Sequence, residues 1–492
     1  MAIRRAAFRV GVGVLVWAIA GAPGSAALRV HPDNPRWLTE DRGETAIVLT
    51  GAHTWSVFQD HRPEGDFDAT GYLDGIAAEG HNFTRGWFWE DGFYAPLPYV
   101  REGGEYRLSP PYDRAYLSRL RSRVRAARQR GLHVSVMLFQ GWSLASYGGR
   151  RRPDPWPENP YNRDNHREQV SKQAAALHIG VAQPQQLDYV AWVGGKLCSE
   201  PNLIWEVTNE SHPESLGAPR ASNWQAAILA AVKRACGRRL TWVSCPATGE
   251  VQEEVKEDLI DRMYQMEADL VSPCDPQERY SENPPAADGR KVVLADSDHL
   301  TVARIDGAWA WRAFLRGQHP LFMDLSQELS WWAGPRWETD DPRWSETRAA
   351  LGSIQELVAV VNRTRSAAPA SGLAEMAPQV GPGGQPGSRT RPASSAWSLY
   401  SSDKPCRRKG EGAKCRKARA NGDEMLAWAD AGQTVRLCRL AGGESYRTRW
   451  KRPFRTGFEG PAEIVLAGSM GCLEAANPAN GPSVVHLERL LP

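Results

Sequence analysis

The chain has 492 residues, of which 41% are hydrophobic and 24% are charged, an ordinary composition for a folded globular protein. Lys and Arg number 60 against 57 Asp and Glu, so the net charge of +3 lacks the strong basic excess of dedicated nucleic-acid-binding proteins. At about 100–200 residues per domain, this length predicts two or three domains, or one large barrel with a further module. The 20 Trp residues supply many flat rings, which can stack on sugars as well as fill a core.

The N-terminus has the pattern of a secretory signal. Three arginines in the first nine residues precede an apolar run, Val10–Ala20, and the small residues Gly24–Ala27 follow as a cleavage region. The apolar run is short for a membrane span of about 20 residues. We therefore predict a signal peptide over residues 1–27, export to the periplasm or the cell exterior, and no stable membrane insertion after cleavage. An uncleaved anchor is the alternative.

The cysteines are even in number, and in an exported chain this favours disulfides. Four lie in each part of the chain, so pairing within each part is the simplest expectation. No Cys-x-x-Cys pair occurs, which leaves a zinc or thioredoxin-type site with little support. The eight residues are Cys198, Cys236, Cys245, Cys274, Cys406, Cys415, Cys438 and Cys472.

Apolar runs that end in polar residues alternate with helical patterns up to about residue 366. The expected strands are 46–51, 82–86, 133–139, 203–207, 240–244, 270–272, 292–295 and 321–323. The expected helices are one ending near 79 and those over 112–130, 187–197, 223–236, 253–267, 308–316 and 343–362. These eight strands alternate with seven helical patterns, and the alternation, interpreted as eight strand–helix pairs with parallel strands, predicts an α/β protein with a closed (β/α)8 TIM barrel over 28–366. An open doubly wound sheet is the alternative, but no Gly-rich turn follows the first strand.

The pattern changes after the barrel. Residues 367–395 are rich in Pro, Gly and Ser and predict a linker or long loop. Short alternating runs follow, which predict a small all-β sandwich over 396–492. Within it, Lys404–Ala420 is a basic segment that a Cys406–Cys415 disulfide would close. We expect a solvated loop there, with an acidic polysaccharide ligand as the alternative.

The chemistry of a TIM barrel lies at the carboxyl ends of its strands. The fourth predicted strand leads into Asn209 and Glu210, and the seventh leads into Asp296, Asp298 and His299. Two carboxyl groups on opposite sides of one barrel mouth meet the requirement for glycoside hydrolysis. One protonates the leaving oxygen, and the other attacks the anomeric carbon or activates water. Apolar and carboxylate neighbours would raise the pKa of the acid.

Five segments in order carry a resemblance to a known family. They are His31–Trp55, Gly80–Asp91, Ile204–Ser211 (IWEVTNES), Ala295–Leu300 (ADSDHL) and Trp309–Asp324. Asn-Glu after the fourth strand with a carboxylate after the seventh resembles glycoside hydrolase clan A. More specifically, the segments resemble the apiosidase-like glycoside hydrolases, bacterial proteins whose C-terminal domain is named for collagen binding. The C-terminal part of the chain matches that pattern more weakly.

The resemblance implies roles for individual residues. Glu210 is the expected acid/base, and Asn209 is expected to hydrogen-bond the sugar 2-hydroxyl. Asp298 is the first choice for the nucleophile and Asp296 the second, although clan A generally has Glu at this position. A carboxyl separation of about 5 Å would predict a retaining reaction and about 6.5–9.5 Å an inverting one.

Further residues at the strand ends are candidates to contact the sugar or to orient a catalytic carboxylate. Core packing or a structural ion pair is the alternative for each of them. These candidates are His53, Trp55, Arg85, Trp87, Trp89, Glu90, Gln140, Trp142, His299 and Asp324. Glu206 shares a strand face with Glu210 and is expected to be a buried partner.

The sequence thus predicts an exported glycoside hydrolase that cleaves an O-glycosidic bond of a polysaccharide or oligosaccharide without a cofactor or a metal. Its expected partner is a carbohydrate and not a nucleic acid. A non-catalytic carbohydrate- or matrix-binding barrel is the second interpretation. A metal-dependent hydrolase is the third, although His53-Thr54-Trp55 supplies one His where such barrels commonly carry His-x-His.

Overall fold

The computed structural model describes most of the barrel and of the C-terminal part, and every structural statement below concerns these residues. Residues 1–26 of the predicted signal peptide, the loop with Cys406 and Cys415, and most of the predicted linker lie outside them. No helix of the described chain is both long enough and apolar enough to cross a bilayer. The described ranges are 27–40, 45–61, 66–144, 155–168, 182–211, 218–246, 252–276, 278–300, 305–324, 342–364, 373–378, 398–401, 424–438, 440, 442–469 and 472–490.

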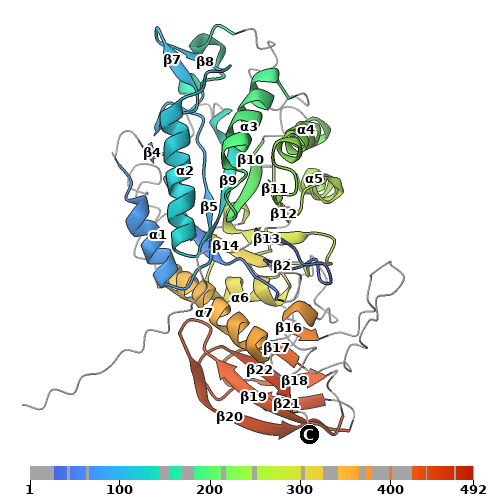
Figure 1. Cartoon of the computed structure of the whole chain (residues 1–492). Helices are drawn as coiled ribbons and strands as arrows, with labels where there is room; N and C mark the ends of the chain where they lie inside the picture. The colour runs from blue at the N-terminus through green and yellow to red at the C-terminus, as the bar shows by residue number, and fades with distance from the viewer. Residues whose placement is uncertain are drawn as a thin grey trace, which may run out of the picture.

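A parallel eight-stranded sheet forms the centre of the molecule (Figure 1). Its order is β3 (Gly51–His53), β14 (His319–Met323), β13 (Val292–Asp296), β12 (Leu270–Ser272), β11 (Thr241–Ser244), β10 (Leu203–Asn209), β9 (His133–Gln140) and β5 (Phe83–Gly86). The Asn82 N–H donates to the Thr50 carbonyl at 3.1 Å beside the β3–β5 seam. The approach there is close, because a Cβ on Gly51 would lie 1.7 Å from the Phe83 carbonyl oxygen. The predicted (β/α)8 barrel is therefore confirmed.

The helices surround this sheet, and their sequence patterns explain them. In α2, the Asp113 carboxylate caps the first turn by accepting from the Ala115 N–H at 2.6 Å. Tyr116, Leu120 and Val124 bury one face of the helix at helical spacing. Within the described residues, the β12–β13 connection contains no α-helix, so the expectation of eight strand–helix pairs is wrong at that connection. The α-helices are α1 (Ala69–Ala78), α2 (Arg114–Gln129), α3 (Pro184–Leu197), α4 (Ala218–Cys236), α5 (Glu253–Gln265), α6 (Gly307–Leu315) and α7 (Pro342–Thr364).

The first barrel strand begins later than the apolar run at 46–51 predicts. Ile47 instead forms an antiparallel bridge with Leu38. The Leu49 N–H donates to Nδ1 of His319 at 2.8 Å, and the Thr50 N–H donates to Oδ1 of Asn82 at 2.9 Å. Side chains from distant segments thus satisfy these backbone groups, and the ladder starts only at Gly51.

Short elements decorate the barrel. The β7–β8 hairpin stands at the end of the molecule opposite the C-terminal domain (Figure 1). The small strands are β1 (Arg29–Val30), β2 (Leu38–Thr39), β4 (Asp60–His61), β6 (Tyr94–Ala95), β7 (Val100–Glu102) and β8 (Glu105–Arg107). The 3-10 turns are η1 (Trp142–Leu144), η2 (Trp156–Glu158), η3 (Arg163–Asn165), η4 (Ser297–His299) and η7 (Leu373–Glu375).

The C-terminal part is all-β, as predicted, and its two antiparallel sheets share a core that includes Met425, Leu437, Leu473 and Val485. Strand β15 lies inside the range predicted as a linker and pairs with β16, so part of that segment contributes to the sheet. One sheet has the order β15 (Met376–Pro378), β16 (Ser398–Ser401), β17 (Glu424–Ala429), β22 (Ser483–Arg489), β19 (Ser445–Lys451) and β20 (Phe458–Leu466). The other pairs β18 (Thr434–Cys438) with β21 (Cys472–Ala476).

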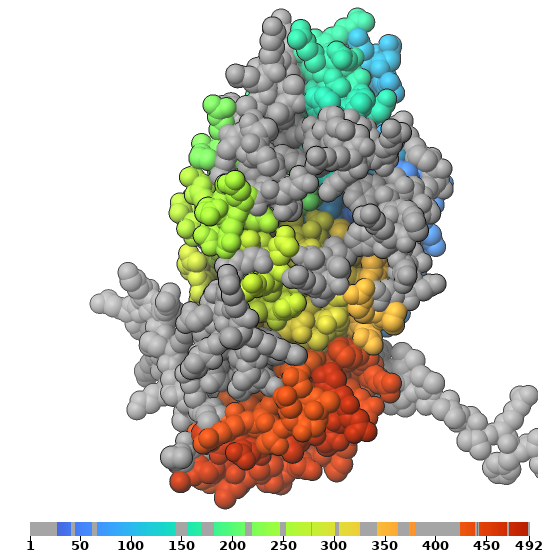
Figure 2. Space-filling model, turned by 180° about the vertical axis from the view of Figure 1, so that it is seen from behind, coloured from blue at the N-terminus to red at the C-terminus, as the bar shows by residue number. Residues whose placement is uncertain are grey.

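The sandwich packs against helices α6 and α7 at one end of the molecule (Figure 1), and the surface of its red segments adjoins the orange segment in Figure 2. The indole N–H of Trp311 donates to the Pro453 carbonyl at 2.8 Å, and the buried Lys451 ammonium donates to Glu356 at 2.7 Å. Gly317, which precedes β14, lies against Pro378 of the sandwich. This contact is at the amino end of a barrel strand, whereas the predicted active site is at the carboxyl ends.

Two disulfides lie within the barrel. Cys198–Cys236 joins the ends of α3 and α4, and Cys245–Cys274 joins the segments that follow β11 and β12. The expectation that the barrel cysteines pair with one another is confirmed.

Candidate active site

Arg85 on β5 connects the polar residues at the carboxyl end of the barrel. Its guanidinium is fully buried and donates to Asp298 Oδ2 at 2.9 Å, to Asn209 Oδ1 at 2.8 Å and to Glu206 Oε1 at 2.6 Å. Burial disfavours the charge, but Glu206, Asp296 and Asp298 outweigh it and raise the pKa of Arg85 above its ordinary value. The planar fork of Arg suits this role, because its donors point in several fixed directions. One side chain thus links β5, the end of β10 and the end of β13.

The two aspartates after the seventh strand have different surroundings. Asp296 is fully buried, and its Oδ1 accepts from His53 Nε2 and from the Asp298 N–H, each at 3.0 Å. Its Oδ2 lies 3.2 Å from Arg85 Nη1. Burial alone would raise the pKa of Asp296, but His53 and Arg85 bring it well below its ordinary value. The Asp298 side chain keeps 9% of its surface exposed, so Asp298 is the more accessible carboxylate.

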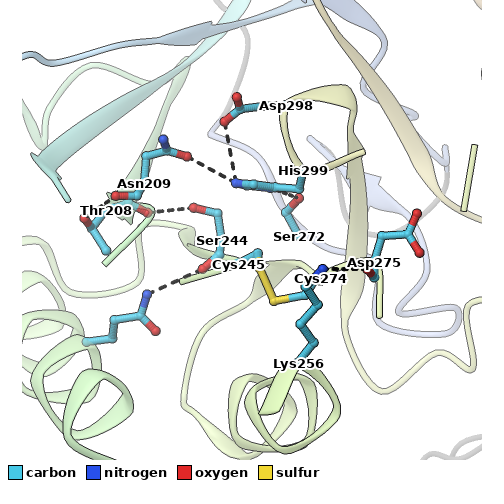
Figure 3. Close-up of a disulfide and its surroundings, with 11 residues drawn as sticks. Thr208, Asn209, Ser244, Cys245, Lys256, Ser272, Cys274, Asp275, Asp298 and His299 are labelled. Atoms are coloured by element: carbon cyan, nitrogen blue, oxygen red, sulfur yellow. Dashed lines mark hydrogen bonds and ion pairs between the residues drawn. A yellow bond between two sulfur atoms is a disulfide. The ribbon is translucent and has the colours of Figure 1, made fainter. Parts of the chain in front are cut away.

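His299 connects the seventh strand end to the fourth. Its Nε2 lies 3.1 Å from Asn209 Oδ1 (Figure 3). The same oxygen also accepts from the donor-only guanidinium of Arg85. The Asn209 atom is therefore the amide oxygen, and His299 Nε2 carries the proton. Burial lowers the pKa of His299, so the ring is neutral at pH 7 and Nδ1 accepts from the Ser272 hydroxyl at 3.3 Å.

Glu210 has a strained backbone. Its φ of +44° lies in the left-handed region, which non-glycine residues seldom occupy and which is enriched at functional sites. The neighbouring strand end fits closely against it, because a Cβ on Gly141 would lie 1.7 Å from the Glu210 carbonyl oxygen. The Gly141 N–H also donates to the Asn209 carbonyl at 2.7 Å. Only glycine at 141 permits this approach.

Glu206 is the buried partner that its strand face predicts. It is the ion-pair partner of Arg85 and lies 3.1 Å from the Ser244 hydroxyl. Burial raises the pKa of Glu206, and Arg85 opposes that rise.

The tryptophans proposed as sugar contacts pack mainly on one another. Trp87 and Trp89 stack at 5.5 Å with 12° between their planes, and Trp55 and Trp142 meet Trp89 edge-on at 5.6 and 5.4 Å. All four are buried. Their arrangement therefore matches the core-packing alternative, and the faces that stack on each other are not offered to a ligand.

Glu90 and Gln140 extend the network from the second and third barrel strands. Glu90 accepts from the Tyr99 hydroxyl at 2.9 Å and from the Gln140 N–H at 3.3 Å. Gln140 Oε1 in turn accepts from Asn209 Nδ2 at 3.3 Å. Burial raises the pKa of Glu90 to about 8. Glu90 and Gln140 are thus joined to the site, but through Asn209 and not directly to Arg85.

Asp324 is directed elsewhere. Its carboxylate accepts from Arg348 on α7 at 2.7 Å. Arg348 also pairs with Glu79, the residue that directly follows α1. The ion pair of Asp324 with Arg348 therefore joins the end of β14 to the helix layer.

Sequence reasoning missed Ser244 and Ser272, which contact Glu206 and His299. Both are the last residues of predicted strands, so the rule that finds site residues at carboxyl ends would have included them. The Cys245–Cys274 disulfide ties together the segments that begin just after these serines (Figure 3). The sequence analysis also missed Trp242, whose ring centre lies 5.1 Å from Arg85 Cζ.

In the described part of the chain, no group of three or more His, Cys, Asp or Glu side chains is arranged to hold a metal ion. Asp296 and Asp298, the carboxylates of the metal-site interpretation, both face the guanidinium of Arg85.

We expect Glu90→Gln to stabilise the protein increasingly as pH rises from 5 to 8. Glu90 stays protonated in the fold until about pH 8, whereas the unfolded chain ionises it near 4.5, so the wild type loses stability across this window. Gln remains neutral in both states, and the gain at pH 8 over pH 5 should be roughly 2–4 kcal/mol. Denaturant midpoints at the two pH values measure it, with the exposed Glu257→Gln as control. Parallel pH profiles for the wild type and Glu90→Gln would contradict the protonated state of Glu90.

The fold has counterparts among solved structures. A structure named as a glycoside hydrolase aligns over 94% of this chain and 97% of its own, with a TM-score of 0.55 and 12% identity. A glycoside hydrolase family 5 structure from Bacteroides vulgatus ATCC 8482 aligns over 95% and 94%, with a TM-score of 0.56 and 12% identity. No protein-family model and no curated protein matches the chain. At this identity the likeness shows a shared fold over nearly the whole chain, the part after the barrel included.

Proposed function

We propose that the protein is an exported glycoside hydrolase, with Glu210 as general acid and Asp298 as the second catalytic carboxylate. The main observation behind this proposal is that the guanidinium of Arg85 donates both to Asp298 and to Asn209, the residue before Glu210. The carboxyl ends of the fourth and seventh barrel strands are thus tied together where barrel enzymes perform their chemistry. Both of the structural neighbours described above are glycoside hydrolases, which supports the same reaction class.

The chemistry follows from the two carboxyl groups. Glu210 donates a proton to the glycosidic oxygen as the bond to the anomeric carbon breaks. Asp298 attacks that carbon as a nucleophile, and Glu210 then removes a proton from the water that hydrolyses the glycosyl ester. With a carboxyl separation of about 6.5–9.5 Å, Asp298 would instead deprotonate the attacking water. The anomer first released, read by NMR, distinguishes the two routes.

The charges of the site suit this reaction. The buried cluster has one cation, Arg85, against the carboxyl groups of Glu206, Asp296 and Asp298, and His299 beside it is neutral. The carboxylates that carry the surplus negative charge are already held in position in the free protein. It would stabilise the positive charge that develops on the sugar ring in an oxocarbenium-like transition state.

Export rests on the signal-like N-terminus and on the two disulfides of the barrel. Disulfides persist in oxidising compartments outside the cytosol. An extracellular or periplasmic polysaccharide, or an oligosaccharide derived from it, is the substrate class that agrees with this location.

The test is the release of reducing ends from a panel of mannans, xylans, β-glucans, arabinogalactans and pectins. We expect the wild type to cleave at least one of them, Asp298→Asn to lose that activity, and Asp258→Asn, which alters an exposed ion pair on α5, to keep it. Full activity in Asp298→Asn would remove Asp298 from the mechanism. Binding to a polysaccharide without cleavage by the wild type would favour a non-catalytic carbohydrate-binding barrel.

A further inference from the structure

Trp87 makes a hydrogen bond that its role in the aromatic packing does not require. Its indole N–H donates to Nδ1 of His53 at 2.9 Å, and both side chains are buried. Indole can only donate, so His53 Nδ1 has no proton in this arrangement. The imidazole proton is therefore on Nε2, which faces Asp296 Oδ1 at 3.0 Å.

The chain of contacts continues to the catalytic carboxylate. Asp296 Oδ1, which accepts from His53, also accepts from the backbone N–H of Asp298 at 3.0 Å. Asp296 Oδ2 lies 3.2 Å from Arg85 Nη1, the same nitrogen that donates to Asp298 at 2.9 Å. Asp296 therefore holds Asp298 twice, through its backbone and through a shared cation.

Trp87 also contacts Arg85, the cation that Asp296 and Asp298 share. The Cζ atom of Arg85 lies 4.4 Å from the centre of the Trp87 ring, within the range of a cation–π contact. The ring face thus contacts Arg85 while the ring edge fixes His53. A Phe at this position would keep a ring face for Arg85 but would have no N–H for His53.

We infer that Trp87 is a positioning residue for hydrolysis, because its indole N–H fixes the His53 tautomer that holds Asp296 and, through Asp296, Asp298. This inference rests on the proposed function. Without the indole donor, His53 Nδ1 is free to take a proton. The ring can then turn its proton away from Asp296 or become an imidazolium that competes with Arg85 for Asp296.

The groups that face His53 are few in the described chain. Asp296 faces it from β13, with Arg85, Asp298 and His299 gathered around that carboxylate. From β14, the Asp324 backbone N–H donates to the His53 carbonyl, whereas the Asp324 carboxylate pairs with Arg348. Asp296 is thus the carboxylate that a change at His53 reaches first.

The experiment compares Trp87→Phe with Trp205→Phe in the full chain labelled with 15N in its His rings. Trp205 is a buried Trp of β10 whose indole nitrogen has no hydrogen-bond partner in the described residues, so it controls for losing an indole from the core. In the wild type and Trp205→Phe, the His53 signals, assigned by their loss in His53→Gln, should show the ring proton on Nε2 and an unprotonated Nδ1.

In Trp87→Phe the fixed Nε2–H form should disappear, and kcat should fall by roughly 10–100-fold, the range found when a hydrogen-bond partner that orients a metal-binding His is removed. A wild-type His53 with its proton on Nδ1 would overturn the inference, as would a Trp87→Phe protein with altered His53 signals and unchanged kcat. If no variant and no wild type cleaves a glycoside, the proposed function fails. The NMR spectra separate that failure from one of the Trp87–His53 bond, because they need no substrate.

Discussion

Replacing Glu210 with Gln is expected to lower kcat by about 10²–10⁴-fold on a natural glycoside, the usual contribution of a general acid. A sugar alkoxide is a poor leaving group and must be protonated as it departs, which Gln cannot do. A dinitrophenyl glycoside of the same sugar leaves without protonation, so its bond cleavage should be far less affected. The kcat/KM values on the two substrates measure the difference, because kcat/KM reports the steps through cleavage of the glycosidic bond and not the later hydrolysis of the glycosyl ester.

The leaving-group dependence makes this test specific. The exposed Glu254→Gln on α5 provides the matched control and should behave as the wild type does on both substrates. An equal loss on both substrates would indicate that Glu210 acts through folding or binding. No loss on either would place the acid elsewhere in the barrel, and the assignment of the fourth strand end would be wrong.

Arg85→Met should destabilise the protein by about 3–5 kcal/mol and abolish hydrolysis. The substitution removes the cation but leaves Glu206, Asp296 and Asp298 close together in a buried site. Taking one partner from a buried ion pair costs far more than removing both, because the remaining charge is desolvated and unpaired. The free energy of unfolding from denaturant titration measures the loss.

Two variants bracket this result. Arg125→Met removes a mostly exposed Arg that pairs with Glu200, and it should change stability by about 0–1 kcal/mol. Adding Glu206→Gln to Arg85→Met should recover part of the lost stability, because one uncompensated carboxylate is removed. If Arg85→Met unfolded no more easily than Arg125→Met, the carboxylates would not depend on Arg85 for their charge.

The two aspartates of the seventh strand show where sequence reasoning reached its limit. Both follow the strand and both could be read as the nucleophile. The structure separates them through residues distant in sequence, since His53 and Arg85 enclose Asp296 and leave Asp298 partly exposed. Spacing along one strand carries no information about which of its side chains a residue two hundred positions away will bind.

The tryptophans show the same limit. Composition suggested rings that stack on sugars, and position placed Trp55, Trp87 and Trp89 at strand ends. The structure packs these rings face to face or edge to face with one another. Whether a ring meets a ligand or another ring depends on what the remaining loops bring beside it, and periodicity does not specify that.

The sequence by itself determined the barrel, the sandwich and the strand ends at which polar residues collect, because the alternation of apolar and polar residues is a local property that each segment carries with it. Only the tertiary structure decided that β3 starts at Gly51, that Glu210 takes a left-handed backbone beside Gly141, and that Arg85 joins β5 to β10 and β13. These features arise when the cylinder closes, since closure alone brings strand ends more than a hundred residues apart within hydrogen-bonding distance.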